Sequence, residues 1–528
     1  MPSEWVLQVV DKVSEYVAER VGLSLEDFAA VLRREKKVED SGVVEEVGYF
    51  ATVTAQVLRR LGGEYGKVAE ELERNSKVDS QKYFSTQQLH PENTNPFTVG
   101  QPVLPEKFVG RTSEIDTAFE RIKYRGHTAI YAPPGMGKTS LLKYLASSQA
   151  WKKQKLDLSK AVIVFLSCYS ITPFTPSGFW VKVLTVMRDK LDGEPELQAE
   201  IEILLEERKN ILEVKDIRYI LRMLGEREKF LMLLVDDYDL ALQSNDQYTE
   251  TDMLTFLSGS RNLAVHSPEA QYITTVVTTL RGLDELGPRL PRGGSPWYNH
   301  YLYIDLKPFT ETEVDKLLAL GIPITSELKE AIQKLTGGHP ALLQIAGYLL
   351  YKHLKVGEFS NYEELIVNFE SETRELFQRT WYQYNEKQQI MLILIALSAL
   401  KNHSRKKMPF DLSDINRTLA QKEKFELADL EERGVIVCED KEKKQDYSFS
   451  LLAMEHWVIQ EASSTDEVSI KNRKKFPNLM NRRQAEKLSQ AIKWLRKHQE
   501  ELPTFLEYTS SLAKLFSSVF KPSQIIDE

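Results

Sequence analysis

The chain has 528 residues, of which 42% are hydrophobic and 28% charged, and its formal net charge is −8. This composition excludes a disordered chain, and the length requires several domains of roughly 150 residues each. The net acidity excludes nucleic-acid binding by the whole surface, although it leaves room for a local basic patch. The two cysteines, together with the lack of a secretory signal and of a long apolar run, predict a cytoplasmic protein without disulfides or a transmembrane segment.

The N-terminal part of the chain has the spacing of apolar side chains that helices show. Trp5–Val17 is the first of these stretches, and the pattern continues through residues 1–78. We therefore expect an N-terminal helical bundle there. Residues 79–100 have no periodicity and contain Pro91 and Pro96, which predicts a linker.

Residues 101–308 alternate apolar runs with helical stretches. This alternation is typical of a parallel sheet covered by helices, with strands buried on both faces. The expected strands are Thr128–Tyr131, Ala161–Ser167, Phe230–Val235, Ile273–Thr279 and Tyr301–Leu306.

A glycine-rich segment, residues 132–139, follows the first expected strand and precedes a helix. Strand, glycine-rich loop and helix are the setting of a P-loop, whose N–H groups and helix N-terminus attract phosphate oxygens. Lys138 is expected to reach the β- and γ-phosphates of ATP, and Thr139 to bind Mg²⁺. Ala132 departs from the consensus, which has glycine as its first residue. The residues expected to bind ATP or ADP here are Pro134, Gly135, Met136, Gly137, Lys138, Thr139 and Ser140.

Two acidic residues end the strand Phe230–Val235, where a parallel sheet binds its ligands. Asp236 is the expected second Mg²⁺ ligand and a nucleotide-binding residue. Asp237 is the expected catalytic residue that polarises the attacking water. Because aspartate is one methylene shorter than the glutamate often found there, we hypothesise slow hydrolysis that suits a switch.

The strand Ile273–Thr279 supplies a third polar element. A polar side chain at the end of the strand beside the P-loop can sense the γ-phosphate, and Thr278 or Thr279 fits this role. Arg281 follows, and it is expected to contact either phosphate or a neighbouring subunit. The catalytic candidates are thus Asp237, Thr279 and Arg281.

The C-terminal half is mostly helical. Residues 309–370 predict a helical lid, 371–462 a winged helix, and 463–528 a basic helical tail. The winged helix is expected to contain the helices Lys387–Leu400, Leu412–Leu419 and Phe425–Glu432 and the strands Val435–Cys438 and Tyr447–Phe449. Apolar spacing from Phe505 to Phe520 predicts a final helix packed on the protein or on a partner, an interfacial membrane helix being the alternative.

These motifs together resemble the STAND-type ATPases, a signal-transducing branch of the AAA+ superfamily, over roughly residues 95–460. Beyond the P-loop and the acidic pair, the likeness rests on Phe108-Val109-Gly110-Arg111 with Glu114, on Leu306–Thr310 with Glu313, and on Gly337–Leu343. By this resemblance Val109, Arg111 and Pro340 also bind the nucleotide, Pro340 near the adenine. The Met-His-Asp motif of apoptotic-type relatives is missing, and Met454-Glu455-His456 is only a partial echo of it.

The resemblance implies a multidomain fold: a parallel-sheet P-loop NTPase core of AAA+/STAND type, a helical lid, a winged helix and an N-terminal helical bundle. It implies an ATP/ADP-dependent signalling switch with Mg²⁺ and slow ATPase activity, as in prokaryotic members with an N-terminal extension. The nucleotide state would control domain opening, homo-oligomer assembly and recruitment of a separate effector or trigger protein through the N-terminal bundle. Antiviral defence or a programmed-death pathway is the expected setting.

Two other functions stay open. A DNA-acting AAA+ ATPase, origin-recognition-like or a transposition regulator, would use the winged helix and residues 470–498, which hold ten basic side chains and one acidic one. Against this alternative, the candidate recognition helix Phe425–Glu432 has four acidic residues and no Lys or Arg. The third function is a scaffold that binds ADP without hydrolysing ATP.

Overall fold

The computed structural model describes residues 95–516, apart from residues 192, 210, 289–294, 324, 357–360, 404–409, 413–414, 416–421, 439–446 and 464–479. The described residues belong to the compact unit Asn95–Glu528, and residues Met1–Thr94 form a separate unit. The predicted bundle 1–78, most of the linker 79–100 and most of the helix Leu412–Leu419 lie outside the described residues.

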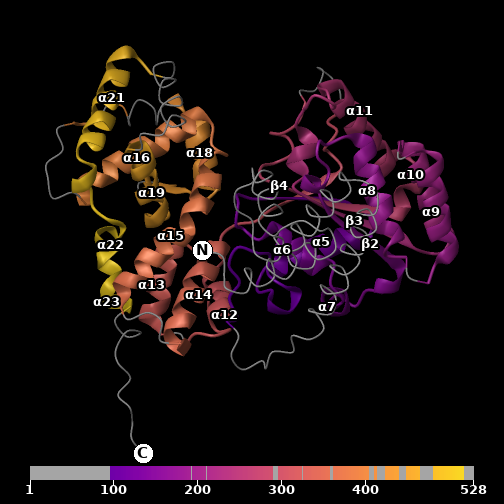
Figure 1. The fold of residues 1–528 in the computed structure, drawn as a ribbon, viewed down its shortest axis with the longest axis horizontal. Helices are drawn as coiled ribbons and strands as arrows, with labels where there is room; N and C mark the ends of the chain where they lie inside the picture. Colours follow the sequence, from indigo (N-terminus) through magenta and orange to yellow (C-terminus); the bar gives the residue numbers. More distant parts are fainter. Residues whose placement is uncertain are drawn as a thin grey trace, which may run out of the picture. The chain divides into compact units, whose positions relative to one another are not determined.

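A five-stranded parallel sheet forms the centre of residues 101–308 (Figure 1), which confirms the predicted parallel-sheet core. Its strands are β1 (His127–Tyr131), β2 (Ala161–Ser167), β3 (Phe230–Asp236), β4 (Ile273–Thr279) and β5 (Tyr301–Asp305), in the order β2-β3-β4-β1-β5. The register pairs Tyr131 with Thr279 and Ser167 with Asp236. The carboxyl ends of these four strands therefore meet at one edge of the sheet, as the predicted ligand site requires.

Helices cover both faces of the sheet. They are α5 (Thr112–Lys123), α6 (Lys138–Leu145), α7 (Ser148–Lys153), α8 (Pro176–Arg188), α9 (Pro195–Glu207), α10 (Val214–Glu226) and α11 (Glu250–Arg261). All seven residues of β3 are buried, and the six apolar ones alternate between two apolar clusters. Met232 and Leu234 pack with residues of α5, α6 and α7, whereas Leu231, Leu233 and Val235 pack with residues of α8 to α11. The period of two along the strand is the reason why both faces had to be covered.

The region after the sheet is helical, as predicted. It contains α12 (Glu311–Leu318), α13 (Ser326–Thr336), α14 (Pro340–Val356), α15 (Tyr362–Trp381), α16 (Glu386–His403), α18 (Lys424–Glu432), β6 (Ile436–Cys438), β7 (Tyr447–Phe449) and α19 (Leu452–Ser463). Strands β6 and β7 pair antiparallel, in the place expected for a wing. The boundary drawn between residues 370 and 371 falls inside the continuous helix α15. The winged-helix assignment stays a prediction.

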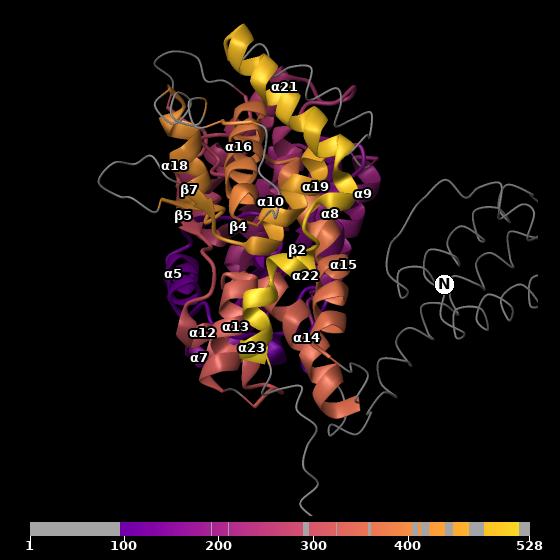
Figure 2. The same cartoon turned by 90° about the vertical axis from the view of Figure 1, so that its left-hand side faces the viewer.

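The last described helices are α21 (Arg482–Lys497), α22 (Phe505–Tyr508) and α23 (Ala513–Phe516). The single helix predicted from Phe505 onward is wrong, because a 3₁₀ turn, Ser510–Leu512, separates α22 from α23. These short helices run beside α15 and α13 (Figure 2). Phe505 and Phe516 are 2% and 0% exposed, so the described part of this segment packs on the protein and not on a membrane.

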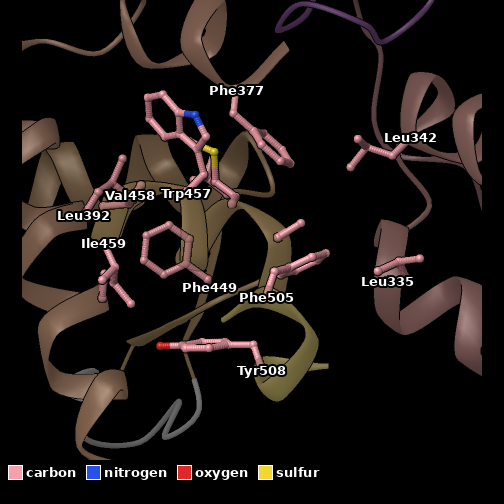
Figure 3. Packing of buried hydrophobic residues seen from close by; sticks show 14 of the residues in the cluster. Leu335, Leu342, Phe377, Leu392, Phe449, Trp457, Val458, Ile459, Phe505 and Tyr508 are labelled. Atoms are coloured by element: carbon pink, nitrogen blue, oxygen red, sulfur yellow. The ribbon is translucent and has the colours of Figure 1, made fainter. Parts of the chain in front are cut away.

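The lid, the winged-helix region and the tail share one hydrophobic core. Leu335 and Leu342 from the lid, Trp457 from α19 and Phe505 from the tail belong to the same cluster of buried side chains (Figure 3). The members of this cluster are far apart in the sequence, from Phe97 to Phe516, so the sequence pattern does not predict that they pack together. No helix in the described part of the chain is long and apolar enough to cross a membrane.

The last residues of the predicted linker are anchored to the lid. Phe97 is 4% exposed and packs against α14 at Gly347, where an added Cβ would lie 2.4 Å from its ring. The Asn95 side-chain amide donates to the Tyr348 carbonyl at 3.1 Å, and the Thr98 N–H donates to the Gln344 side chain at 2.8 Å. The described part of the linker is therefore packed on and hydrogen-bonded to α14 of the lid.

Candidate functional site

The P-loop has the backbone that phosphate binding requires. Gly135 and Gly137 have φ of +78° and +90°, in the left-handed region that glycine tolerates. Gly137 precedes the first residue of α6, so N–H groups of this helix end face the loop. Ala132 is fully buried and has no left-handed φ, so the backbone does not require the consensus glycine at that position.

The lysine of the loop bonds to the loop itself. The Lys138 ammonium donates to the carbonyls of Ala132 and Pro133, at 2.8 and 3.2 Å. Burial lowers the pKa of Lys138, and the carboxylates of Asp239, Asp236 and Asp237 oppose that shift. A nucleotide phosphate placed in the loop would offer this buried cation a second set of acceptors.

The two predicted Mg²⁺ ligands lie side by side. The Thr139 hydroxyl donates to Oδ2 of Asp236 at 2.6 Å, and the Thr278 hydroxyl donates to Oδ1 of the same carboxylate. Asp236 is 3% exposed. A hydroxyl and a carboxylate at this separation suit Mg²⁺, which prefers oxygen ligands and takes its remaining ligands from phosphate and water. The residues present therefore fit the ion that the sequence predicts.

Asp237 leaves β3 in a left-handed conformation, with φ +52°. Its carboxylate accepts a hydrogen bond from the Ser167 hydroxyl at 2.8 Å, and its N–H donates to the Thr278 hydroxyl at 3.2 Å. Burial raises the pKa of Asp237, and the charge of Asp236 adds to that shift. The predicted catalytic carboxylate thus lies at the sheet edge beside the metal ligand, held by β2 and β4.

A third carboxylate, Asp239, belongs to the same site, and the sequence reasoning missed it. It accepts hydrogen bonds from the Leu280 N–H at 3.0 and 3.2 Å, which ties it to the end of β4. Burial raises its pKa, and Asp239 is the carboxylate that acts most strongly on Lys138. The sequence contains a signal for this residue, because Asp239 is the third acid of the run Asp236-Asp237-Tyr238-Asp239 at the end of β3. Asp239 is the second residue of the 3₁₀ helix Tyr238–Leu242, which begins directly after Asp237.

The two threonines at the end of β4 differ in what they contact. Thr278 bonds to Asp236, whereas the Thr279 hydroxyl donates to the Arg281 carbonyl at 2.6 Å. The structure therefore brings Thr278 to the carboxylates and turns Thr279 toward its own chain. Arg281 donates to the Gln383 carbonyl, after α15, and its guanidinium lies 3.9 Å from the Glu285 carboxylate.

Arg111 joins three parts of the site. Its N–H donates to Glu313 of α12 at 2.7 Å, and its guanidinium donates to the carbonyls of Lys307 at 2.6 Å and Met136 at 3.2 Å. The side chain also pairs with Glu114 at 3.2 Å, and burial lowers the pKa of Arg111. Because Arg111 is 3% exposed, these bonds hold the segment before α5, the P-loop and the lid together.

The other residues of that segment lie near this junction. Val109 packs at the edge of the lid core. Gly110 lies so close to the lid that an added Cβ would be 2.5 Å from the Glu313 carboxylate.

The motif around Pro340 lies directly on the P-loop. The His339 ring donates through Nε2 to the Pro134 carbonyl at 3.2 Å, and the Ala341 N–H donates to the Gly135 carbonyl at 3.2 Å. Pro340, buried between these two donors, begins α14.

His456 lies elsewhere. Its Nδ1 is 3.2 Å from the Glu370 carboxylate, and its Nε2 bonds to the Pro503 carbonyl at 3.2 Å. Its hydrogen-bond partners are thus in α15 and the tail. The partial echo of the Met-His-Asp motif therefore places its histidine in the core shared by lid, winged-helix region and tail.

The chain is similar to one family model and to several solved structures. Residues 128–320 match the family model of the NACHT domain. Similar solved structures include a Walker-type ATPase of Pyrococcus abyssi, with 16% identity, a TM-score of 0.46 and coverage of 69% of this chain and 99% of that one. The Aeropyrum pernix ORC2 protein, in its ADPNP-ADP complexes, has 14% identity and a TM-score of 0.43, with coverage of 71% and 99%.

A third similar structure is that of a Signal Transduction ATPase with Numerous Domains (STAND) protein with a tetratricopeptide repeat sensor from Pyrococcus horikoshii. It has 16% identity and a TM-score of 0.29, and the match covers 81% of this chain and 55% of that one. No curated protein matches the chain.

The contact between loop and lid predicts the effect of one substitution. In Gly135→Ala the new Cβ would lie 2.7 Å from Cε1 of His339 and 2.9 Å from Cβ of Ala341, at a φ of +78°. Loop and lid must separate to admit it, so we expect the Kd for ADP, measured by calorimetry, to rise at least about tenfold. Gly100→Ala is the matched control, because its φ is +74° with nothing within 4 Å. Equal effects of the two substitutions would contradict the prediction.

Proposed function

We propose that this chain, a STAND-type P-loop ATPase with a NACHT domain, is an ATP/ADP-dependent switch whose nucleotide state controls the closure of the lid and winged-helix region on the ATPase core. One observation carries the proposal. The predicted phosphate site is also the place where the lid bonds to the core, through Arg111, His339 and Ala341. A change in the conformation of the P-loop would therefore alter the hydrogen bonds that hold the lid.

The residues of the site divide the work of binding. The glycines and the N-terminus of α6 surround the phosphates, and Lys138 neutralises their charge. Thr139 and Asp236 would hold Mg²⁺, which would supply positive charge beside the phosphate oxygens. Asp237 and Asp239 are the candidate groups that orient water, while Thr278 connects Asp236 to the end of β4.

Polar contacts farther from the loop support a closed state. Arg433, directly after α18, lies 3.4 Å from the Glu285 carboxylate of the core and 2.8 Å from the Asp429 carboxylate of α18. The Lys307 ammonium donates to the Glu432 carbonyl at 2.9 Å. Hydrogen bonds and ion pairs of this kind exchange with water at a small net cost, unlike an apolar core. The contacts between the core and the winged-helix region therefore suit a reversible closure.

In the proposed cycle the open form assembles into a homo-oligomer and recruits a separate effector or trigger protein through the N-terminal helical bundle. The setting is cytoplasmic signalling, with antiviral defence as the candidate pathway. Arg281 would leave Gln383 on opening. It would then be free to face the γ-phosphate or a neighbouring subunit, as the sequence predicts.

The experiment that tests the switch compares assembly with two nucleotides. In size-exclusion chromatography with light scattering, the full chain with ADP and Mg²⁺ is expected to elute as the smaller species. With a slowly hydrolysed ATP analogue it is expected to elute as the larger one. Asp236→Asn removes a Mg²⁺ ligand and should abolish the difference, whereas Asp246→Asn, at an exposed position, should preserve it. Identical wild-type profiles with both nucleotides would refute the proposal.

Turnover tests the role of the short carboxylate. If Asp237 limits the reach to water, Asp237→Glu should hydrolyse ATP several-fold faster than the wild type in a phosphate-release assay. Equal or lower turnover in the variant would argue against this explanation and would shift the role toward Asp239, to be checked with Asp239→Asn. Wild-type protein that binds ADP but releases no phosphate would favour the scaffold function.

DNA binding is the second candidate function, and α21 is the observation that favours it. Arg482, Arg483, Lys493 and Lys497 are exposed on this helix, whereas its apolar side joins the core shared with the lid. The acidic helix α18 presents Phe425, which is 89% exposed, and so suits a protein partner better than a DNA groove.

A gel shift with duplex DNA at about 150 mM salt separates the two functions. The proposed switch predicts no DNA complex at micromolar protein, because few phosphate contacts survive that ionic strength. A complex that weakens in a variant with Arg482, Arg483, Lys493 and Lys497 replaced by glutamine would instead support the DNA-acting ATPase.

A further inference from the structure

Four successive backbone carbonyls of the P-loop accept hydrogen bonds, two from Lys138 and two from the lid. Two successive carbonyls, those of Ala132 and Pro133, accept hydrogen bonds from the Lys138 ammonium at 2.8 and 3.2 Å. The next two, those of Pro134 and Gly135, accept hydrogen bonds from the lid. Lys138 is thus the loop's own donor to its first two carbonyls, and the lid supplies the donors to the next two.

The lid donors, His339 and Ala341, flank Pro340, the first residue of α14. Nε2 of His339 is 3.2 Å from the Pro134 carbonyl oxygen, and the backbone N of Ala341 is 3.2 Å from the Gly135 carbonyl oxygen. The ring of His339 also lies against Gly135, where an added Cβ would be 2.7 Å from Cε1. The imidazole thus combines a hydrogen bond with a close fit to the loop backbone.

The ring acts as a neutral donor. Burial, aided by the charges of Arg111 and Lys138, lowers the pKa of His339 to about 4, although its bond to Pro134 opposes that shift. The imidazole is therefore uncharged at physiological pH and carries one N–H. Because a carbonyl only accepts, the proton lies on Nε2.

Lys138 and the lid have different parts in nucleotide binding. When the ammonium turns to phosphate, the carbonyls of Ala132 and Pro133 lose their donor. The two bonds from the lid need no change at that moment. The lid, together with the Arg111 bond to the Met136 carbonyl, is therefore able to hold the loop in shape while the nucleotide is bound.

We propose that His339 is a positioning residue that holds the P-loop, through the Pro134 carbonyl, in the shape that receives the nucleotide phosphates. The inference rests on the proposed nucleotide site and deepens it. The lid supports binding by contact with the loop backbone, without touching the nucleotide through this side chain. Closure of the lid and nucleotide affinity are then coupled in both directions, as thermodynamic linkage requires.

The chain contains a matched control for this proposal. His456 also donates through Nε2 to a proline carbonyl at 3.2 Å, but that carbonyl belongs to Pro503 in the tail. His339→Leu and His456→Leu each remove a ring donor from a half-buried or buried place and leave a proline carbonyl without it. Only the first substitution should change nucleotide binding.

The test measures fluorescent ADP on the full chain with Mg²⁺, by equilibrium titration and by chase. His339→Leu is expected to raise the Kd about tenfold, chiefly through faster dissociation, and to raise KM for ATP with kcat unchanged. His339→Gln, whose amide nitrogen can reach the position of Nε2, should restore the Kd to within about threefold of the wild type. His456→Leu should leave the Kd unchanged. Ala341→Pro removes the other lid donor and should act in the same direction, should His339→Leu fail to fold.

The outcomes separate this inference from the function on which it rests. Wild-type protein that does not bind fluorescent ADP would refute the proposed nucleotide site itself. A wild type that binds, together with a His339→Leu variant of equal affinity, would overturn the positioning role and leave the switch intact. Equal loss in His339→Leu and His339→Gln would also overturn it, because ring packing and not the donor would then be responsible.

Discussion

The shared hydrophobic core of the lid, the winged-helix region and the tail is the constraint on which the rest of the structure depends. The tail lies along α13 and α15, with Phe505 and Phe516 buried among lid and α19 side chains. Separating these parts would expose a large apolar surface, at roughly 25 cal/mol for each Å². They therefore form one body, which the polypeptide between β5 and α12 joins to the core around the parallel sheet.

The contacts between this body and the core have a different chemistry. Arg111, Arg281 and Arg433 each reach across the junction to a carboxylate or a backbone carbonyl. Such bonds are directional and nearly balanced by bonds to water. Polar contacts of this kind at the junction suit movement there, and the predicted phosphate site lies at the junction. These polar contacts are the physical basis of the proposed switch.

Three carboxylates are buried at the sheet edge, where burying negative charge is unfavourable. Asp236, Asp237 and Asp239 lie together near one lysine, and burial raises the pKa of Asp237 and Asp239. Hydrogen bonds from Ser167 and from the Leu280 N–H partly offset this cost. Mg²⁺ held by Thr139 and Asp236 would offset it further. The site is thus electrostatically poised for a cation, and sequence reasoning found two of its three acids.

The sequence by itself determined the strands of the sheet, the P-loop and the pairing of Thr139 with Asp236, because local periodicity and motif spacing control these features. Tertiary structure decided which threonine of β4 bonds to Asp236. It also decided that Asp239 accepts a hydrogen bond from the Leu280 N–H and that Arg281 bonds to the Gln383 carbonyl. It also decided that a predicted amphipathic helix breaks and packs on the lid. These outcomes depend on side chains that meet across long stretches of chain, and no local pattern in the sequence records which partner a polar group will find.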